Sequence, residues 1–408
     1  MTVLRELVPP AGAVRVLALS NLAKGIGNGI LMTLLVLYAS GPLGIPATRV
    51  GLALTIGAVA GMAVSVPAGQ VADRFGARRT AVGSLLLLGI CATGYSLVDT
   101  FWELAFVAAL VLASDSAAGA ARGALVAALV PRAERTRALS YMRSMGNIGI
   151  GIGALIGGLA LRLDNPAAYR ALLTLAGIVF AAAGLAFLTV PTVGARHAPA
   201  INHGWAVLRD RPYAAVAALN AVLAMNGGIL VVALPVWIAT HTSAPHSLYA
   251  ALLLVNTVVV VMLQVWASRG VNDVTGGAAT LRRAGIALGA CCVLFAVVPR
   301  NAAIVDAVLL IAGTLVHVLG EMWYSVGSWA LAFGLAPDHA QGQYQGFFGM
   351  STQLSTAVTP LAVATLIVGL GVTGWLILAL LMCTAGAACP TVARWAERSR
   401  STPLASAK

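Results

Sequence analysis

Long apolar stretches recur along this chain of 408 residues, and they decide what it can fold into. A helix needs about 20 predominantly apolar residues to cross the hydrocarbon core of a bilayer. The chain is 60% hydrophobic with a mean hydropathy of +0.92, which is far above soluble domains. The stretches are too long, and lack the alternation, for the strands of an outer-membrane barrel. The sequence therefore predicts an all-α membrane protein with about twelve transmembrane helices, at approximately residues 14–38, 47–71, 80–98, 102–130, 138–161, 168–190, 213–239, 247–268, 284–299, 302–333, 344–368 and 372–393.

The first apolar stretch is expected to stay in the protein as a helix. It is too long for a cleavable signal, contains Lys24 and lacks a convincing small-residue cleavage site. The five cysteines lie in apolar segments without the spacing of metal ligands, so neither a disulfide framework nor a metal site is predicted.

Lysine and arginine are distributed unequally between the two sets of helix ends. One set carries eighteen of the 25 basic residues, whereas the other carries four, namely Arg49, Arg162, Arg170 and Arg300. This asymmetry is the positive-inside pattern, which predicts that both termini are cytoplasmic. The net charge of +12 therefore indicates contact with anionic lipid, and nucleic acid is not expected as a partner.

A polar connection divides the apolar stretches into two sets of six. The sequence predicts an N-terminal six-helix bundle over residues 1–190, a cytoplasmic linker over 191–212, and a C-terminal bundle with a short cytoplasmic tail over 213–408. No phosphate-binding loop ending in Gly-Lys-Ser/Thr is present, so energy is expected from an ion gradient and not from a nucleotide.

A charged run separates the second and third apolar stretches in a chain of which only 9% is charged. Its spacing predicts a tight turn between two helices at a membrane surface. It reads Gly69-Gln-Val-Ala-Asp73-Arg74-Phe-Gly76-Ala-Arg78-Arg79. This run resembles the signature loop between helices 2 and 3 of transporters of the major facilitator superfamily.

The resemblance implies two six-helix bundles, each built from inverted three-helix repeats, with a substrate site at mid-depth between them. It also implies that the signature loop acts as a conformational gate. Asp73 would lie at the cytoplasmic N-terminus of helix 11, where the helix dipole favours a negative charge. Arg78 would reach Glu134 in the next cytoplasmic loop. The second half repeats the signature only weakly, around Arg269 and Asp273.

The fifth apolar stretch is rich in glycine. Gly149, Gly153, Gly157 and Gly158 are predicted to form a helix face that another helix can approach closely. The face is either a packing surface alone or the counterpart of the glycine-rich motif on helix 5 of drug:proton antiporters, which it resembles. Ala154 stands where that branch usually has proline.

Ionisable groups at membrane depth cost about 2.5–3.5 kcal/mol each and mark functional sites by default. Lys24 and Asn28 lie inside the first stretch, and Asp115 and Arg122 inside the fourth. In the superfamily these two helices line the central cavity. Lys24 is expected to pair with Asp115, either as part of the transport site or as a structural ion pair.

The tenth stretch supplies one acid near its middle. Glu321 follows His317 by one helical turn, which puts both side chains on the same face. Glu321, His317 and Asp115 are the candidates for proton coupling. The arrangement resembles multidrug antiporters of the superfamily that carry a glutamate on helix 10. The alternative is a hydrogen-bonded acid with a structural role.

Weaker candidates for the substrate cavity are polar or aromatic residues of the C-terminal half. Each aromatic residue has core packing or interface anchoring as an alternative role. They are Asn220, Asn226, Trp237, Asn256, Gln264, Trp323, Tyr324 and Gln353. Pro235 and Pro360 are expected to kink their helices.

The sequence thus predicts a secondary transporter of a bacterial plasma membrane, with no enzymatic activity and no cofactor beyond a proton gradient. A monomer that exports hydrophobic drugs or natural products in exchange for protons is the leading hypothesis. Transport of one small metabolite stays open, because the interior charges sum to +1 (Lys24, Arg122 and Arg143 against Asp115 and Glu321) and suit an anion. A sensor on the same scaffold also stays open. Arg122 is followed by Gly123-Ala124 and not by the Gln-Gly step of many proton antiporters.

Overall fold

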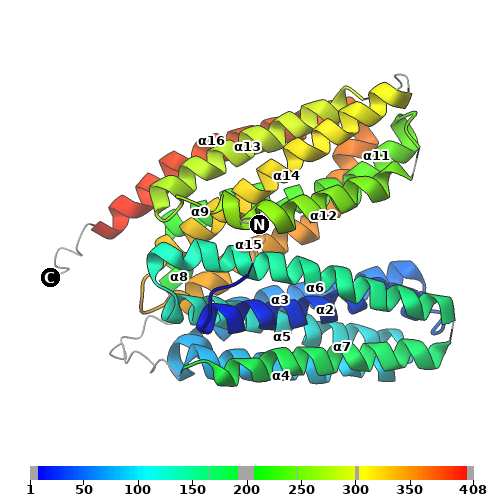
Figure 1. Ribbon diagram of the computed structural model, residues 1–408, viewed down its shortest axis with the longest axis horizontal. Helices are drawn as coiled ribbons and strands as arrows, with labels where there is room; N and C mark the ends of the chain where they lie inside the picture. The colour runs from blue at the N-terminus through cyan, green and yellow to red at the C-terminus, as the bar shows by residue number, and fades with distance from the viewer. Residues whose placement is uncertain (1–7, 164, 192–205, 246, 299–302, 402–408) are drawn as a thin grey trace. The chain divides into compact units, whose positions relative to one another are not determined.

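The computed structural model describes residues 8–163, 165–191, 206–245, 247–298 and 303–401 (Figure 1). The chain divides into two compact units. The first unit contains residues 1–204 and 336–350, and the second contains residues 205–335 and 351–408. Most of the predicted linker 191–212 lies outside the described residues.

Six long helices build the first unit. They are α2 (Ala13–Ser40), α3 (Ala47–Phe75), α4 (Ala77–Gly94), α5 (Phe101–Leu129), α6 (Arg135–Leu163) and α7 (Pro166–Ala186). α2 packs against α6 and α7, α3 packs against α5, and α4 packs against both α5 and α7. Local sequence sets the helix starts: Thr100 and Glu103 form a capping box on α5, and Asn165 caps α7.

The second unit begins with the short helix α8 (Ala206–Arg209). It continues with α9 (Arg211–Ala224), α10 (Asn226–Gly228), α11 (Leu234–His241), α12 (Leu248–Ala267), α13 (Val274–Ala296), α14 (Ala303–Gly334) and α16 (Val372–Ser401). α13 packs against α14 and α16, and α12 packs against α14. α15 (Gln341–Ala362) starts in residues of the first unit and ends in residues of the second.

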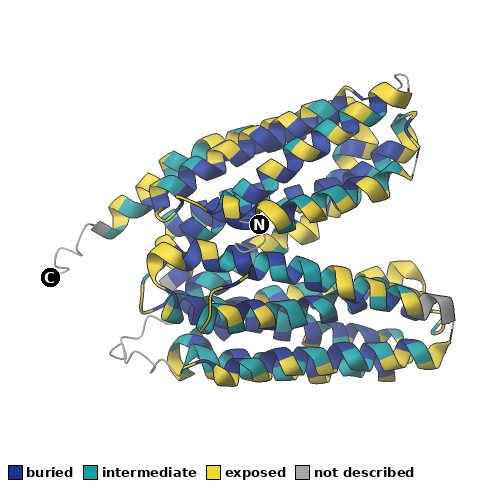
Figure 2. Ribbon diagram, in the orientation of Figure 1, coloured by how far each residue is buried: buried dark blue, intermediate teal, exposed yellow. Residues whose placement is uncertain are grey.

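The all-α membrane fold predicted from the sequence is confirmed. Within the described residues, 11 helical segments are long and apolar enough to cross a membrane, and α6 adds a further helix of 29 residues. Buried and exposed residues form stripes along these helices (Figure 2). Large apolar side chains such as Trp102 (75% exposed) and Ile304 (79% exposed) lie on the outer stripes, as expected for contact with lipid.

The signature loop is a turn of one residue. α3 ends at Phe75, α4 begins at Ala77, and Gly76 between them has a φ of 98°. Side chains other than hydrogen rarely permit this conformation, so the glycine is required by the backbone. The corresponding connection of the second unit is different, because residues 268–273 separate α12 from α13 and Asp273 caps α13.

A π-helical segment lies close in sequence to each of the two prolines for which a kink is predicted. Residues Ile229–Ala233 are π-helical directly before α11, which contains Pro235, and Val363–Val368 are π-helical shortly after Pro360 in α15. Proline lacks the N–H group that would bond to the carbonyl four residues earlier, which for Pro235 is that of Val231, inside the first π-helical segment. The two segments contact each other within the second unit.

The glycine face of α6 lies against α2. A methyl group built on Gly149 would overlap the carbonyl oxygen of Leu22, and one built on Gly153 would overlap that of Ile26. Gly157 also faces α2. The two backbones therefore approach so closely that no side chain fits between them, which is how small residues hold membrane helices together.

Gly158 does not belong to this face. The sequence analysis grouped it with the other three, but the space around its Cβ position is open. One residue rotates the side-chain direction by about 100°, which turns position 158 away from α2.

Replacing Gly153 with leucine is expected to destabilise the first unit by about 2 kcal/mol or more, because the backbone of α2 would have to move. Thermal unfolding in detergent, followed by the loss of monodisperse protein, measures the effect. Gly158→Leu is the matched control on the same helix and should leave the melting temperature almost unchanged. Equal stability of the two variants would contradict the close approach.

Candidate functional sites

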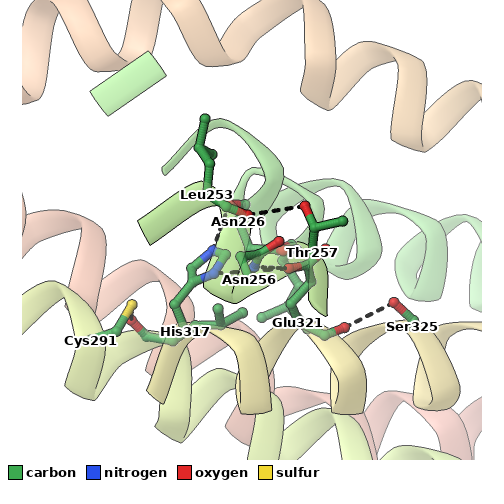
Figure 3. A network of polar contacts seen from close by, with 10 residues as sticks. Asn226, Leu253, Asn256, Thr257, Cys291, His317, Glu321 and Ser325 are labelled. Atoms are coloured by element: carbon green, nitrogen blue, oxygen red, sulfur yellow. Dashed lines mark hydrogen bonds and ion pairs between the residues drawn. The ribbon is translucent and has the colours of Figure 1, made fainter. Parts of the chain in front are cut away.

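The side chain of Glu321 lies in a polar cluster of the second unit (Figure 3). Asn256 of α12 donates from Nδ2 to Glu321 Oε2 at 2.9 Å. His317, one turn earlier on α14, has its Nδ1 at 3.9 Å from the same oxygen. The Glu321 side chain is 16% exposed and that of His317 only 1%. Two titratable groups therefore face each other in a largely buried site.

The other ring nitrogen of His317 fixes its tautomer. Nε2 lies 3.0 Å from the carbonyl oxygen of Asn226. A carbonyl oxygen can only accept, so Nε2 carries a hydrogen and Nδ1 is the nitrogen that gains or loses a proton. Because Nδ1 is directed toward Glu321, the imidazole and the carboxyl group belong to one polar site.

Apolar packing brings the cluster together. Val260 of α12 is completely buried against Val318 and Met322 of α14. This contact sets the two helices side by side, and Asn256 lies one turn before Val260 on the same face. Ser325 donates to the backbone oxygen of Glu321 at 2.8 Å, one turn further along α14.

A second charged cluster lies in the first unit. Lys24 Nζ of α2 is 2.7 Å from Asp115 Oδ1 of α5, with side-chain exposures of 13% and 36%. Arg122, two turns further along α5, donates from Nη1 to Asn21 Oδ1 at 2.7 Å. The structure thus forms the Lys24–Asp115 pair expected from the sequence and adds Asn21, which lies one turn before Lys24.

Asn21 also fixes its own orientation. Its Nδ2 donates to the carbonyl oxygen of Met142 on α6, which leaves Oδ1 directed at Arg122. Asn256 was predicted from the sequence only as a weaker cavity candidate, and Asn21 was not predicted as a site residue. Their position in the sequence could have indicated them, because each asparagine lies in a predicted membrane helix, where its amide group needs hydrogen-bond partners.

The carboxylate of Asp73 caps the N-terminus of α15. It accepts from the backbone N–H groups of Gly342 at 2.7 Å and Gln343 at 3.0 Å. These two residues belong to the first unit. A carboxylate at this position satisfies free donors of the first helical turn and is stabilised by the helix dipole.

The other residues of the signature loop differ in exposure: Gly69 is buried against Gly342, whereas Gly76 and Arg78 are partly exposed. Arg78 has a partner that the sequence did not indicate, since its Nη2 donates to the carbonyl oxygen of Leu188 at 2.8 Å. Arg74, Arg79 and Glu134 are exposed. In the connection between α5 and α6, which also contains Glu134, Arg132 pairs with Asp338 at 2.7 Å.

The weaker cavity candidates lie in different surroundings. Trp237 is fully buried and donates to the carbonyl oxygen of Phe295 at 2.9 Å. Asn220 is buried and bonded to Ser351 and Ser328. These contacts correspond to the core-packing alternative. Partly buried positions are occupied by Asn28, Trp323, Tyr324 and Gln353, whereas Asn226 and Gln264 are buried.

The fold is that of a multi-pass membrane protein with ionisable clusters at membrane depth. A profile of the Major Facilitator Superfamily matches residues 17–360. The chain therefore belongs to the major facilitator superfamily, whose members are secondary transporters of small molecules and not enzymes.

Similarity to individual proteins is lower. The multidrug resistance protein MdtH of Yersinia enterocolitica is 32% identical over 148 residues, which are 36% of this chain and 37% of that protein. MdtH of Yersinia pestis is 30% identical over the same length. The match thus spans little more than a third of these relatives.

Solved structures share the fold. The Escherichia coli fucose:proton symporter FucP has a TM-score of 0.72 at 16% identity and covers 94% of this chain and 98% of its own. A bacterial homologue of the iron transporter ferroportin has a TM-score of 0.72 at 14% identity, with coverages of 94% and 99%.

Replacing Asp73 with alanine is expected to weaken the first turn of α15 by about 1 kcal/mol, because two N–H groups lose their acceptor. Hydrogen–deuterium exchange at Gly342 and Gln343 should become severalfold faster. Asp99→Ala removes an exposed acid paired with Arg170 and serves as the control. Unchanged exchange in the Asp73 variant would show that the carboxylate does not cap this helix.

Proposed function

We propose that this transporter exports hydrophobic small molecules in exchange for protons, with Glu321 as the proton-binding residue. The contact between Glu321, His317 and Asn256 is the observation that carries the proposal. An ionisable pair at membrane depth is costly and is retained where it has a function. The partial similarity to proteins named multidrug resistance protein supports the choice of substrate.

Two protonation states follow from the geometry. With Glu321 ionised, its Oε2 accepts from Asn256 and faces a protonated His317 across 3.9 Å. With Glu321 protonated, its O–H group can turn toward the neutral Nδ1. Asn256 can keep its hydrogen bond to Glu321 in each state, whereas His317 Nδ1 at 3.9 Å is near enough for an ion pair but not for a hydrogen bond.

A proton gradient supplies enough energy for export. One elementary charge that crosses the membrane potential contributes about 2.3 kcal/mol per 100 mV. In the proposed cycle, protons from outside bind Glu321 after the substrate has left and return the carrier to its inward-facing state. Asp73, by capping α15, stabilises the state in which the cytoplasmic gate is closed. Asp115, paired with Lys24, is a second acid that protons can reach.

The proposed setting is the inner membrane of a bacterium, with both termini in the cytoplasm. The uneven distribution of basic residues supports this orientation. The proposed carrier works as a monomer surrounded by lipid.

A second candidate function is proton-coupled transport of one small anionic metabolite. The charges of Lys24, Arg122 and Asp115 sum to +1, and this net positive charge favours an anionic substrate.

Replacing Glu321 with glutamine is expected to reduce export of the neutral dye Nile red from energised cells of an efflux-deficient host to the leak rate. The amide keeps the size and the contact with Asn256 but cannot exchange a proton. Fluorescence decay after dye loading, with and without a protonophore, measures coupled export.

Glu103→Gln is the matched control, because glutamine can still complete the capping box of α5. This variant should export at the wild-type rate, and immunoblots of membranes should show equal amounts of both proteins. Protonophore-sensitive export by the Glu321 variant at the wild-type rate would remove Glu321 from the proton path.

A further inference from the structure

The charged cluster of the first unit carries an uncompensated positive charge. Lys24 and Arg122 are cations, and among the described residues Asp115 is the acid that interacts with both of them. Asp115 makes its close contact with Lys24 at 2.7 Å. At neutral pH the three groups together therefore sum to +1.

The hydrogen-bond partner of Arg122 is neutral. Its Nη1 donates to the amide oxygen of Asn21, which is held in place by the carbonyl oxygen of Met142. A guanidinium group has five N–H donors in a planar fork, and this contact uses one of them. The others remain for a ligand, and the fork matches the two oxygens of a carboxylate.

An excess positive charge inside a membrane protein is unfavourable unless an anion accompanies it. We propose that the first unit binds the carboxylate group of the transported molecule at Arg122, with Lys24 contributing to the positive potential. Among the hydrophobic molecules that the carrier exports, those with one carboxylate are thus the ones that it binds most tightly. This inference rests on the proposed export function, because it names the substrate class of the same carrier.

Contacts between three helices fix the orientation of the side chains in this cluster. Asn21, Lys24, Asp115 and Arg122 come from two helices, and the contact with Met142 ties them to a third. The pair between Lys24 and Asp115 leaves the net charge of the cluster to Arg122. The carboxylate preference should therefore follow the sum of the three charges, and not the presence of the ion pair.

Binding to the purified full-length protein in lipid nanodiscs tests the proposal without requiring transport. The probes are 1-naphthylacetate, 1-pyrenebutyrate and 9-anthracenecarboxylate, each compared with its uncharged alcohol. We expect at least one carboxylate to bind about tenfold more tightly than its alcohol, measured by quenching of tryptophan fluorescence. Equal affinities for all three pairs would overturn the proposal.

Charge variants locate the site. Arg122→Gln and Lys24→Gln each bring the sum of the three charges to zero and should lower carboxylate affinity about tenfold. The double variant Lys24→Gln/Asp115→Asn restores the sum to +1 and should regain most of that affinity. Arg49→Gln removes an exposed arginine of the same unit and should bind like the wild type.

Two further outcomes keep the test decisive. Arg122→Lys keeps the positive charge but lacks the planar fork of the guanidinium group, so it should bind the carboxylate probes with intermediate affinity. This second variant keeps the test valid if Arg122→Gln misfolds. Glu321→Gln should keep the carboxylate preference even where proton coupling is lost, so failure of the export proposal is recognisable separately. A double variant that binds as weakly as Lys24→Gln would contradict control by net charge.

Discussion

The cost of placing a charge in hydrocarbon governs where this chain can carry ionisable groups. Most basic residues lie at helix ends. Within the described helices, the interior acids Asp115 and Glu321 each have a partner at hydrogen-bonding or ion-pairing distance. Both clusters link helices that are distant in sequence, so the interactions that make the charges tolerable also hold the helices of each unit in register.

The fold could be predicted from the sequence because its signals are local. Apolar length identified the membrane helices, and the glycine spacing on α6 identified the face that packs on α2. The irregular parts could not be predicted in detail. Pro235 and Pro360 indicated kinks, but a π-helical register depends on neighbouring helices that re-satisfy the backbone, which no local pattern encodes.

The site could be predicted in part. Composition singled out Lys24, Asp115, His317 and Glu321, because ionisable residues are rare at membrane depth. Their neutral partners were harder to identify. Asn21 and Asn256 act through rotamers and helix packing, and many polar residues in such helices serve only local bonds, as Asn226 does toward Leu223. Sequence spacing does not separate the two cases.

The joint at Gly76 constrains how the first unit can deform. Only one residue separates α3 from α4. A translation or rotation of one helix is therefore expected to move the other helix as well. In the second unit, the longer connection 268–273 lets α12 tilt while α13 stays in place. We therefore expect α3 and α4 to be coupled more tightly than α12 and α13, so that this joint differs in stiffness between the two units.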